Sequence, residues 1–168
     1  MTSEHRIEVV AHRGSSAEEP EHTLAAYLRA LDEGADAVEC DVRLTSDGHL
    51  VLVHDRRINR TSTGTGSVSR KTLKELSAFE YDAQDSIWHD VEEPIVLGDE
   101  RRNVLTLTKL LETLCEYHRR VGIAIELKHP TRFGKYVEME LADTLKRYGL
   151  DSPMTVSYTH LTLPTILL

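Results

Sequence analysis

The side chains best suited to chemistry stand where short apolar segments end. His12 and Arg13 follow the apolar run Ile7–Ala11, and His54 follows Leu50–Val53. An imidazole has an ordinary pKa of about 6.5, so two histidines can serve as general base and general acid near neutral pH. A guanidinium binds phosphate with paired, charge-assisted hydrogen bonds. These residue types together suit acid–base chemistry on an anionic substrate.

Three carboxylates accompany these groups. Glu39 and Asp41 are separated by one residue in the segment Ala37–Leu44, and Glu126 and Lys128 are separated in the same way. Side chains two residues apart in a strand point to the same side. Carboxylates held close together repel unless a cation balances them, and ligand sets made of oxygen suit Ca²⁺ or Mg²⁺ better than zinc. A metal, a cationic phosphate contact and two histidines together predict phosphoester cleavage.

Each of these observations has a simpler explanation when it is taken alone. A histidine at a strand end is commonly a polar residue without a catalytic role. Glu39 and Asp41 would also fit the solvent side of a half-exposed strand, because a period of two does not identify the buried face. The alternate positions hold Val38, Cys40 and Val42, which in a barrel would face the surrounding helices and leave the carboxylates in the lumen. The joint placement on four successive strands favours the catalytic interpretation.

Strands and helices must alternate to bring these side chains together. The expected strands are Ile7–Ala11, Ala37–Leu44, Leu50–Val53, Ile123–Leu127 and a fifth beginning at Met154–Val156. The apolar run Ile7–Ala11 is expected to be a buried strand. The expected helices are His22–Glu33, Arg70–Ser77, Leu107–Arg119 and Phe133–Tyr148. Thr23 is the expected N-cap of the first helix, and Gly34 is its expected C′ residue. This alternation predicts an α/β fold on parallel strands, whose carboxyl ends meet at one face.

Composition narrows the class of partner. The 168 residues include 20 Lys and Arg against 28 Asp and Glu, a formal net charge of −8, which disfavours nucleic acid or an anionic membrane as the main partner. No apolar run reaches the roughly 18 residues of a transmembrane segment, and no apolar leader opens the chain, so we expect a cytoplasmic location. Cys40 and Cys115 are far apart in the sequence and are expected to be reduced, buried thiols.

Six sequence elements, in this order along the chain, resemble the glycerophosphodiester phosphodiesterase family. They are Ala11-His12-Arg13-Gly14, Glu19-Pro20-Glu21-His22-Thr23, Glu39-Cys40-Asp41-Val42, His54-Asp55, Arg60-Thr61-Ser62-Thr63-Gly64-Thr65-Gly66 and Glu126-Leu127-Lys128. The resemblance covers the chain from Ile7 to Met154. It departs from the usual family pattern at His22, where the family usually has Asn, and at Leu105-Thr106-Leu107, where Pro-Thr-Leu is usual.

The resemblance implies a TIM (β/α)₈ barrel, of which this chain holds four to five N-terminal strands, with a small insertion, residues 56–103, after the third strand. It implies a divalent cation, Ca²⁺ or Mg²⁺, and a small-molecule glycerophosphodiester as substrate. The implied roles are metal ligation by Glu39, Asp41 and Glu126, acid–base catalysis by His12 and His54, and phosphate or substrate contact by Arg13 and Lys128.

The resemblance also implies a reaction. The diester is split into sn-glycerol 3-phosphate and an alcohol: the glycerol 2-hydroxyl attacks phosphorus, and the resulting cyclic phosphate is then hydrolysed. Two alternatives stay open, a lysophospholipase D-type lipid phosphodiesterase on the same scaffold and a catalytically silent binding module. The presence of both histidines beside all three carboxylates disfavours the silent module. The alcohol head group and the oligomeric state are not set by the sequence.

The chain is too short for a complete barrel, and its C-terminal segment differs in composition from the rest. A barrel of this class needs about 200 to 250 residues, so residues 1–155 are expected to be its N-terminal portion. A half barrel exposes two strand edges, so the chain alone is expected to be poorly soluble and nearly inactive. Ser152–Leu168 contains no charged residue. It reads either as one apolar strand and loop or, as we favour, as sequencing-adapter sequence that makes residues 156–168 a non-native tail.

Overall fold

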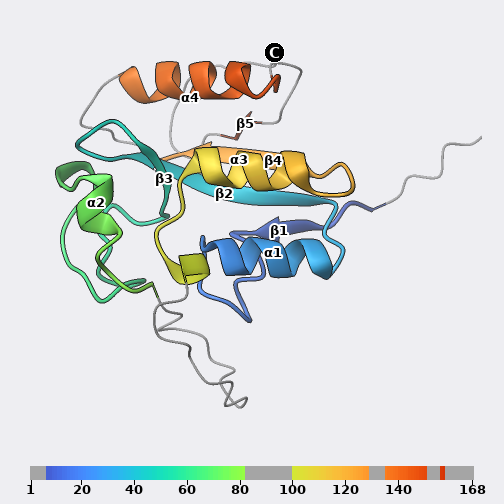
Figure 1. Ribbon diagram of the computed structural model, residues 1–168, viewed down its shortest axis with the longest axis horizontal. Helices are drawn as coiled ribbons and strands as arrows, with labels where there is room; N and C mark the ends of the chain where they lie inside the picture. The colour runs from blue at the N-terminus through green and yellow to red at the C-terminus, as the bar shows by residue number, and fades with distance from the viewer. Residues whose placement is uncertain (1–6, 82–99, 129–134, 151–155, 158–168) are drawn as a thin grey trace, which may run out of the picture.

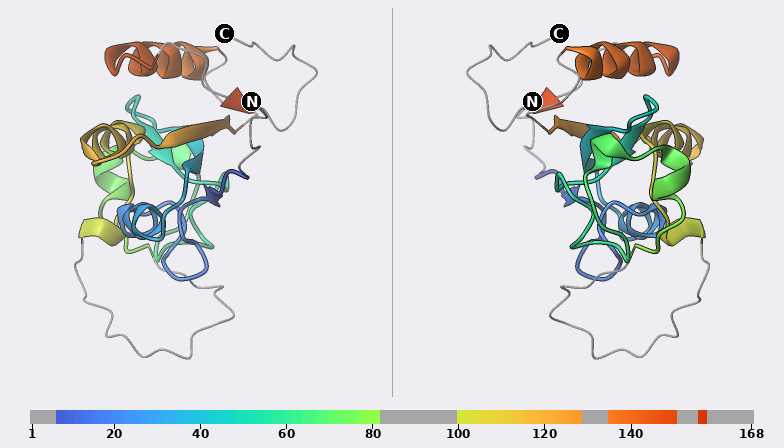
Figure 2. Two further views of the ribbon diagram at one scale, coloured as in Figure 1. Left: turned by 90° about the vertical axis from the view of Figure 1, so that its right-hand side faces the viewer. Right: turned by 90° about the vertical axis from the view of Figure 1, so that its left-hand side faces the viewer.

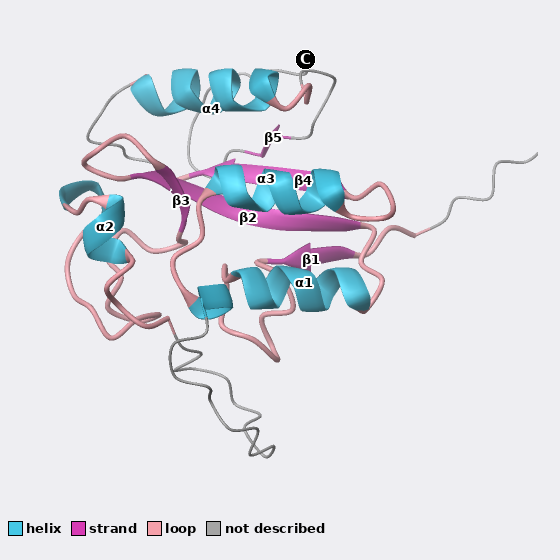
Figure 3. Cartoon of the chain, viewed as in Figure 1, coloured by secondary structure: helices cyan, strands magenta, loops and turns pink. Residues whose placement is uncertain are grey.

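A computed structural model describes residues 7–81, 100–128, 135–150 and 156–157 (Figure 1). Strands and helices alternate along these residues, as predicted (Figure 3). The elements are β1 (Val10–His12), α1 (Leu24–Asp32), β2 (Ala37–Leu44), β3 (Leu50–Leu52), the 3₁₀ helix η1 (Val68–Arg70), α2 (Leu73–Leu76), the 3₁₀ helix η2 (Glu100–Arg102), α3 (Leu107–Glu116), β4 (Gly122–Leu127), α4 (Tyr136–Arg147) and β5 (Val156–Ser157). The alternation confirms the α/β fold class.

One sheet positions the candidate site. Its strands follow the order β1-β2-β4-β5 and run parallel, and β3 pairs with β2 from outside this path. Helices α1 and α3 lie on the same side of the sheet (Figures 1 and 2). Parallel strands with helices on one face are the arrangement found in part of a (β/α)₈ barrel, so the expected partial barrel is confirmed.

The hydrophobic core lies between the sheet and the helices. Val38, Cys40 and Val42 of β2 are completely buried and belong to this core, together with residues of β4 and of the helices. Their burial places the alternate residues of β2, Glu39 and Asp41, on the opposite face of the sheet. The expectation that the apolar positions face the helices is therefore confirmed.

Strand β3 departs from the expected parallel arrangement. It pairs antiparallel with the end of β2, with Leu50 opposite Leu44 and Leu52 opposite Val42. The expectation that four successive strands run parallel was wrong here. The connection, residues 45–49, is too short for a parallel crossover, which needs about a dozen residues or more. The strands that run parallel to β2 are β1 and, on the other edge of β2, β4, which follows later in the sequence.

The first strand is shorter and more exposed than predicted. The expected buried strand covered Ile7–Ala11, whereas β1 covers Val10–His12. Ile7 is 87% exposed, and Val9 and Val10 are also exposed. In the described part of the chain, β1 pairs with β2 alone, so one of its edges carries no strand. The prediction of burial for this segment was wrong for that reason.

The helix ends follow local side-chain chemistry. Thr23 caps α1 as predicted: its Oγ1 accepts a hydrogen bond from the Ala26 backbone N–H at 3.2 Å. Gly34 follows the helix with a φ of 92°, which glycine adopts without strain. The expected helix Arg70–Ser77 is instead divided into η1 and α2. Helix α2 begins after Thr72, whose side chain and Glu75 form a reciprocal capping box.

The two thiols differ in their surroundings. Cys40 is buried, as expected, but Cys115 is exposed, and the expectation for Cys115 was wrong. The buried face of α3 consists of Leu107, Leu110 and Leu111. Cys115 stands in the last turn of this helix, beyond those residues. In the described part of the chain, no helix is both long and apolar enough to cross a membrane.

The segment after β3 builds a second, smaller core. Val51 and Val53 pack there against Ile58, Val68 and Leu76. This segment corresponds to the first part of the expected insertion, residues 56–103, of which residues 82–99 lie outside the described residues. The start of the predicted helix at Phe133, the strand start at Met154 and most of the tail also lie outside them.

Candidate active site

The face of β2 opposite the helices carries the acidic site. Glu39 and Asp41 lie on this face, and the register of the parallel pair β2–β4 places Glu126 beside Asp41. One carboxylate oxygen from each of Glu39, Asp41 and Glu126 lies within 4.8 Å of the others. The structure therefore brings together the three carboxylates that sequence reasoning selected as metal ligands.

Asp41 is the most enclosed member of the carboxylate cluster. Its side chain is only 1% exposed. His22 Nε2 lies 2.9 Å from Asp41 Oδ2, and Arg13 Nε lies 3.2 Å from the same oxygen. Burial favours the neutral acid, but the hydrogen bond from His22 and the ammonium of Lys128 outweigh burial and lower the pKa of Asp41 below its ordinary value. Asp41 is therefore ionised at neutral pH.

The pKa of Glu39 is shifted in the opposite direction from that of Asp41. Burial, and then the charge of Asp41, raise the pKa of Glu39 to about 7, although the Arg13 backbone N–H donates to Glu39 Oε2 at 3.1 Å. Its second neighbour is His12, whose Nε2 lies 3.9 Å from the same oxygen. Both causes favour the neutral form of this carboxyl, and a cation beside it would favour the ionised form.

The donor chemistry fits a hard divalent cation. Asp41 Oδ1 is buried and accepts no hydrogen bond, and its contact with Lys128 Nζ at 3.0 Å is an ion pair. Burial, and then the charge of Asp41, raise the pKa of Glu39, and a bound cation would offset both effects. Carboxylate oxygens from Glu39, Asp41 and Glu126 are the ligand type that Ca²⁺ and Mg²⁺ prefer.

Lys128 lies at the centre of the same cluster. Besides its approach to Asp41 Oδ1, its ammonium forms a hydrogen bond with Glu126 Oε1. Its side chain and that of Arg13 are mostly buried. Two cations are thus placed beside the carboxylates, where a phosphate group could contact them.

The two candidate catalytic histidines reach the site by different routes. His12 ends β1, its side chain is 67% exposed, and it approaches Glu39 as described. His54 follows β3, and the Val53 backbone N–H donates to the Asp41 carbonyl at 3.1 Å, which places His54 beside the acidic strand. His54 Nδ1 lies 2.7 Å from Asp55 Oδ1. His54 therefore lies beside β2 at the level of Asp41, although β3 is antiparallel to β2.

The loop after β1 adopts backbone conformations that few residues tolerate. Arg13 and His22 both have a φ of 61°, and Gly14 has a φ of 83°. A Cβ on Gly14 would lie 2.7 Å from the Ala26 carbonyl carbon, so only glycine fits there. The loop is closed by a hydrogen bond from the His22 backbone N–H to the Arg13 carbonyl at 3.1 Å. This turn directs the backbone of Arg13 toward Glu39.

Sequence reasoning missed two residues of this site. His22 is buried, and its Nδ1 lies 2.8 Å from the Tyr27 hydroxyl. Burial lowers the pKa of His22 despite the carboxylate of Asp41 beside it. Because an ionised carboxylate can only accept, the proton of the contact with Asp41 is on His22 Nε2, and the Tyr27 hydroxyl donates to the Glu39 carbonyl at 3.1 Å. Its only signal was the departure from the family pattern. Arg43 donates from Nε and Nη2 to the His54 carbonyl at 3.1 and 2.7 Å.

Arg43 had a signal in the sequence. It continues the alternation of Glu39 and Asp41 along β2, so the same period of two places all three side chains on one face. Burial lowers the pKa of Arg43 from its ordinary value, although a guanidinium stays charged at neutral pH.

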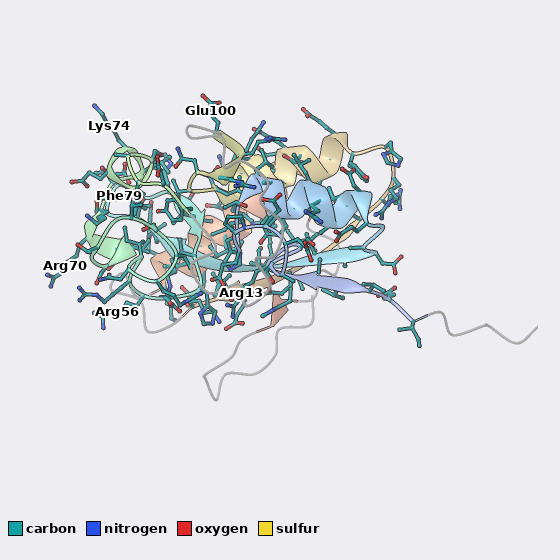
Figure 4. The ribbon with its side chains drawn as sticks, turned by 90° about the horizontal axis from the view of Figure 1, so that it is seen from below. Arg13, Arg56, Arg70, Lys74, Phe79 and Glu100 are labelled. Carbon is teal, nitrogen blue, oxygen red and sulfur yellow. The ribbon has the colours of Figure 1, made fainter. Side chains whose placement is uncertain are left out.

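Figure 4 shows Arg13 amid the side chains near the sheet, whereas Arg70 and Lys74 extend outward from the segment after β3.

Comparisons with known proteins show the family of this chain. The family model described as "Glycerophosphoryl diester phosphodiesterase family" matches residues 12–155. The "Probable glycerophosphodiester phosphodiesterase 1" of Mycobacterium tuberculosis is 56% identical over 146 residues, which are 86% of this chain and 51% of that protein. A glycerophosphodiester phosphodiesterase of Bacillus subtilis is 31% identical over 151 residues, 89% of this chain and 49% of that protein. The chain spans about half the length of these curated relatives.

Solved structures share the fold. The crystal structure of a glycerophosphodiester phosphodiesterase from Agrobacterium tumefaciens matches with a TM-score of 0.72 and 28% identity, over 92% of this chain and 59% of that one. The structure of an Oleispira antarctica phosphodiesterase in complex with the product sn-glycerol-3-phosphate matches with a TM-score of 0.75 and 28% identity, over 92% of this chain and 58% of that one. The partial sheet described here is thus found in longer chains of known structure.

Proposed function

This chain belongs to the glycerophosphoryl diester phosphodiesterase family, and we propose that the protein containing it hydrolyses glycerophosphodiesters to sn-glycerol 3-phosphate and an alcohol. The observation that carries the proposal is the cluster of Glu39, Asp41 and Glu126 with Lys128 and Arg13 beside it. Such a site offers ligands for a metal and cationic contacts for a phosphate in one place. The product sn-glycerol-3-phosphate in the Oleispira antarctica structure supports the substrate class.

We assign Glu39, Asp41 and Glu126 as the ligands of a divalent cation, Ca²⁺ or Mg²⁺. A bound cation would stabilise the negative charge that develops on the phosphate oxygens. The lack of a hydrogen bond to Asp41 Oδ1 and the raised pKa of Glu39 support this assignment. Within the cluster, Lys128 bridges Asp41 and Glu126 and keeps their carboxylates close together.

His12 and His54 are the proposed acid–base pair. One imidazole takes the proton of the glycerol 2-hydroxyl as its oxygen attacks phosphorus. The other donates a proton to the alcohol oxygen as the bond from phosphorus to that oxygen breaks. Water then opens the cyclic phosphate with the proton transfers reversed. Two positions support these roles: His12 lies 3.9 Å from Glu39, and His54 directly follows Val53, whose backbone N–H donates to the Asp41 carbonyl.

Arg13 and Lys128 are the proposed phosphate contacts. The backbone N–H of Arg13 donates to Glu39, and its Nε forms an ion pair with Asp41 at 3.2 Å. The guanidinium therefore lies beside the acidic cluster, where it can contact an anionic substrate. Both cations also balance the carboxylates that surround them, which lowers the electrostatic barrier to an approaching phosphodiester.

We further propose that residues 1–155 are the N-terminal portion of the barrel, that residues 56–103 form its insertion and that residues 156–168 are a non-native tail. The family match ends at residue 155, which supports this boundary. Val156 and Ser157 nevertheless pair with Ile125 and Glu126 of β4 as β5. Genomic DNA read across codons 150–170 tests the boundary directly: a native reading frame through codon 168 would contradict it.

The test of function uses the full-length protein that contains this chain. Incubation with glycerophosphocholine or glycerophosphoethanolamine should release sn-glycerol 3-phosphate, and the variants His12→Ala and His54→Ala should lose this activity. His49→Ala, at an exposed histidine in the turn before β3, is the matched control and should remain active. Activity that survives both site substitutions, or that is complete after chelation, would contradict the mechanism. A preference for lysophospholipid would favour the lysophospholipase D-type alternative.

A further inference from the structure

A continuous chain of ionic hydrogen bonds joins the two proposed catalytic loops. Beginning at His54, Nδ1 lies 2.7 Å from Asp55 Oδ1, and Arg60 Nε donates to Asp55 Oδ2 at 2.8 Å. The other two nitrogens of Arg60 donate to Glu21, Nη2 to Oε1 at 2.7 Å and Nη1 to Oε2 at 3.1 Å. Glu21 Oε2 finally accepts from Arg13 Nη1 at 3.4 Å.

We propose that Arg60 is a positioning residue that sets the His54 ring and the Arg13 guanidinium relative to each other. Arg60 lies in the segment after β3, and Glu21 lies in the loop after β1, 39 residues earlier. The inference rests on the proposed function, because His54 and Arg13 have their roles only in that reaction. Arg60 itself would not touch the substrate.

The geometry of the guanidinium suits this role. All three nitrogens of Arg60 are used, by two different carboxylates. A planar guanidinium offers these donors in fixed directions, whereas an ammonium acts as a single compact charge. The Glu21 side chain is 16% exposed and those of Asp55 and Arg60 about a third. These partly buried ion pairs are weakly screened by solvent.

Charge keeps the chain of bonds intact at neutral pH. Burial favours the neutral acid at both Glu21 and Asp55, but hydrogen bonds and charge from Arg60 outweigh it and lower the pKa of each carboxyl. The same two partners raise the pKa of Arg60. Both carboxylates are therefore ionised, and the cation between them stays charged.

The branch toward His54 sets the proton-transfer atom. An ionised carboxylate can only accept a hydrogen bond, so the Asp55 contact requires a proton on His54 Nδ1. The other ring nitrogen, Nε2, is then available for proton transfer. Arg43 holds the backbone carbonyl of the same residue. The ring and the backbone of His54 are thus fixed from two sides.

The branch toward Arg13 sets the phosphate contact. Glu39 holds the backbone N–H of Arg13 and Asp41 lies beside its Nε. Glu21 then holds the end of the guanidinium, at Nη1. Without Arg60, Glu21 would lose two hydrogen bonds and would be free to turn away from Arg13. A change at Arg60 should therefore disturb both halves of the site together.

The experiment uses the full-length protein that contains this chain, with glycerophosphocholine as substrate. Arg60→Met should lower kcat/KM by about 100-fold, the effect of a misplacement of about 1 Å in a catalytic group. Asp55→Asn should mainly lower kcat, because it disturbs only the His54 branch. Glu21→Gln should mainly raise KM, because it disturbs only the Arg13 branch. Arg60→Lys should recover only part of the loss.

Arg57→Met is the matched control. Arg57 lies in the same segment and is exposed, and among the described residues its guanidinium contacts Asn59 at 3.3 Å. Its kinetic constants should equal those of the wild type. If the wild type is active and Arg60→Met and Arg57→Met have equal kinetic constants, the positioning role of Arg60 is overturned while the proposed function stands. A wild type without phosphodiesterase activity would overturn the proposed function and the inference with it.

Thermal unfolding separates positioning from a purely structural role. If Arg60→Met does not fold, the milder variants Asp55→Asn and Glu21→Gln decide the question, since each keeps Arg60 and one of its carboxylates. The inference requires the split between kcat and KM in these two variants. Identical losses of activity that follow only the loss of folded protein would contradict it.

Discussion

His22 Nε2 lies 2.9 Å from Asp41 Oδ2, and the two side chains are 3% and 1% exposed. The histidine ring spans the space between this carboxylate and the hydroxyl of Tyr27 on α1. A buried carboxylate that loses a hydrogen-bond donor keeps its desolvation penalty. His22 therefore fixes the position of Asp41, a proposed metal ligand. It does so through Oδ2, whereas Oδ1 of the same carboxylate contacts Lys128 in the acidic cluster.

The first prediction concerns His22 itself. His22→Leu should destabilise the full-length protein by about 1 to 3 kcal/mol, because Asp41 and Tyr27 lose a buried partner. His22→Asn should reduce the free energy of unfolding by less, because Asn tolerates a positive φ and carries a side-chain donor. Urea unfolding of both variants measures the difference. Equal stability of His22→Leu and wild type would show that the contact contributes nothing.

The second prediction is a pH dependence set by Glu39. Its pKa rises from 4.5 to about 7 in the folded protein, by burial first and then by the charge of Asp41. The folded state thus binds this proton more tightly than the unfolded state, so Glu39 contributes stability below pH 4.5 that is lost as the pH rises through about 7. Metal-free wild type should lose more stability across this window than metal-free Glu39→Gln.

The outcome that contradicts this second prediction is a parallel pH profile. If wild type and Glu39→Gln change together between pH 4.5 and pH 7, Glu39 does not hold its proton as described. Asp41 does not interfere in this window, because its pKa is lowered and its titration lies at lower pH. Guanidinium unfolding at several pH values, in the presence of a chelator, makes the comparison.

The third prediction concerns the metal. Ca²⁺ or Mg²⁺ should raise the unfolding temperature of the full-length protein, and the chelated protein should lose that gain. Asp41→Asn and Glu126→Gln should each weaken binding, because each removes a charged oxygen ligand from the cluster. Calorimetric titration with the metal alone measures the affinity without any substrate.

The matched control for the metal prediction is Glu116→Gln. Glu116 is exposed at the end of α3, away from the acidic cluster. This variant should bind the metal as the wild type does. Metal binding that is unchanged in Asp41→Asn and in Glu126→Gln would remove the proposed ligand assignment.

The fourth prediction compares two glycines with similar backbone angles. Gly14 and Gly34 have φ values of 83° and 92°. A Cβ at Gly14 would lie 2.7 Å from Ala26, whereas nothing lies within 4 Å of one at Gly34. Gly34→Ala should cost about 1 kcal/mol from its backbone alone, and Gly14→Ala should cost clearly more. Equal melting temperatures for the two variants would show that the loop moves away from α1 without penalty.

Strand periodicity predicted more of the site than any other signal. On β2 it placed Glu39 and Asp41 on one face and Val38, Cys40 and Val42 on the other, as the core shows. Periodicity does not encode the direction of a strand, so it could not show that β3 returns antiparallel. The short turn before β3 carried that information instead.

Contacts between distant segments were beyond sequence reasoning. Glu21 and Arg60 are far apart along the chain, and nothing in their local patterns marks them as partners. Burial of His22 was equally hidden, because histidine has no strong preference for either the interior or the surface. The exposure of β1 also depended on which strands lie beside it rather than on its apolar residues.

The hairpin of β2 and β3 has a consequence for the order of folding. A hairpin closes in about 1 to 10 µs, whereas pairing of β2 with β4 must first close the long connection 45–121, at a larger entropic cost. His54 should therefore reach Asp41 early, and Glu126 should join them later. Pulsed hydrogen exchange during refolding should protect the β3 amides before those of β4. His54 would then lie beside β2 before the third carboxylate of the site arrives.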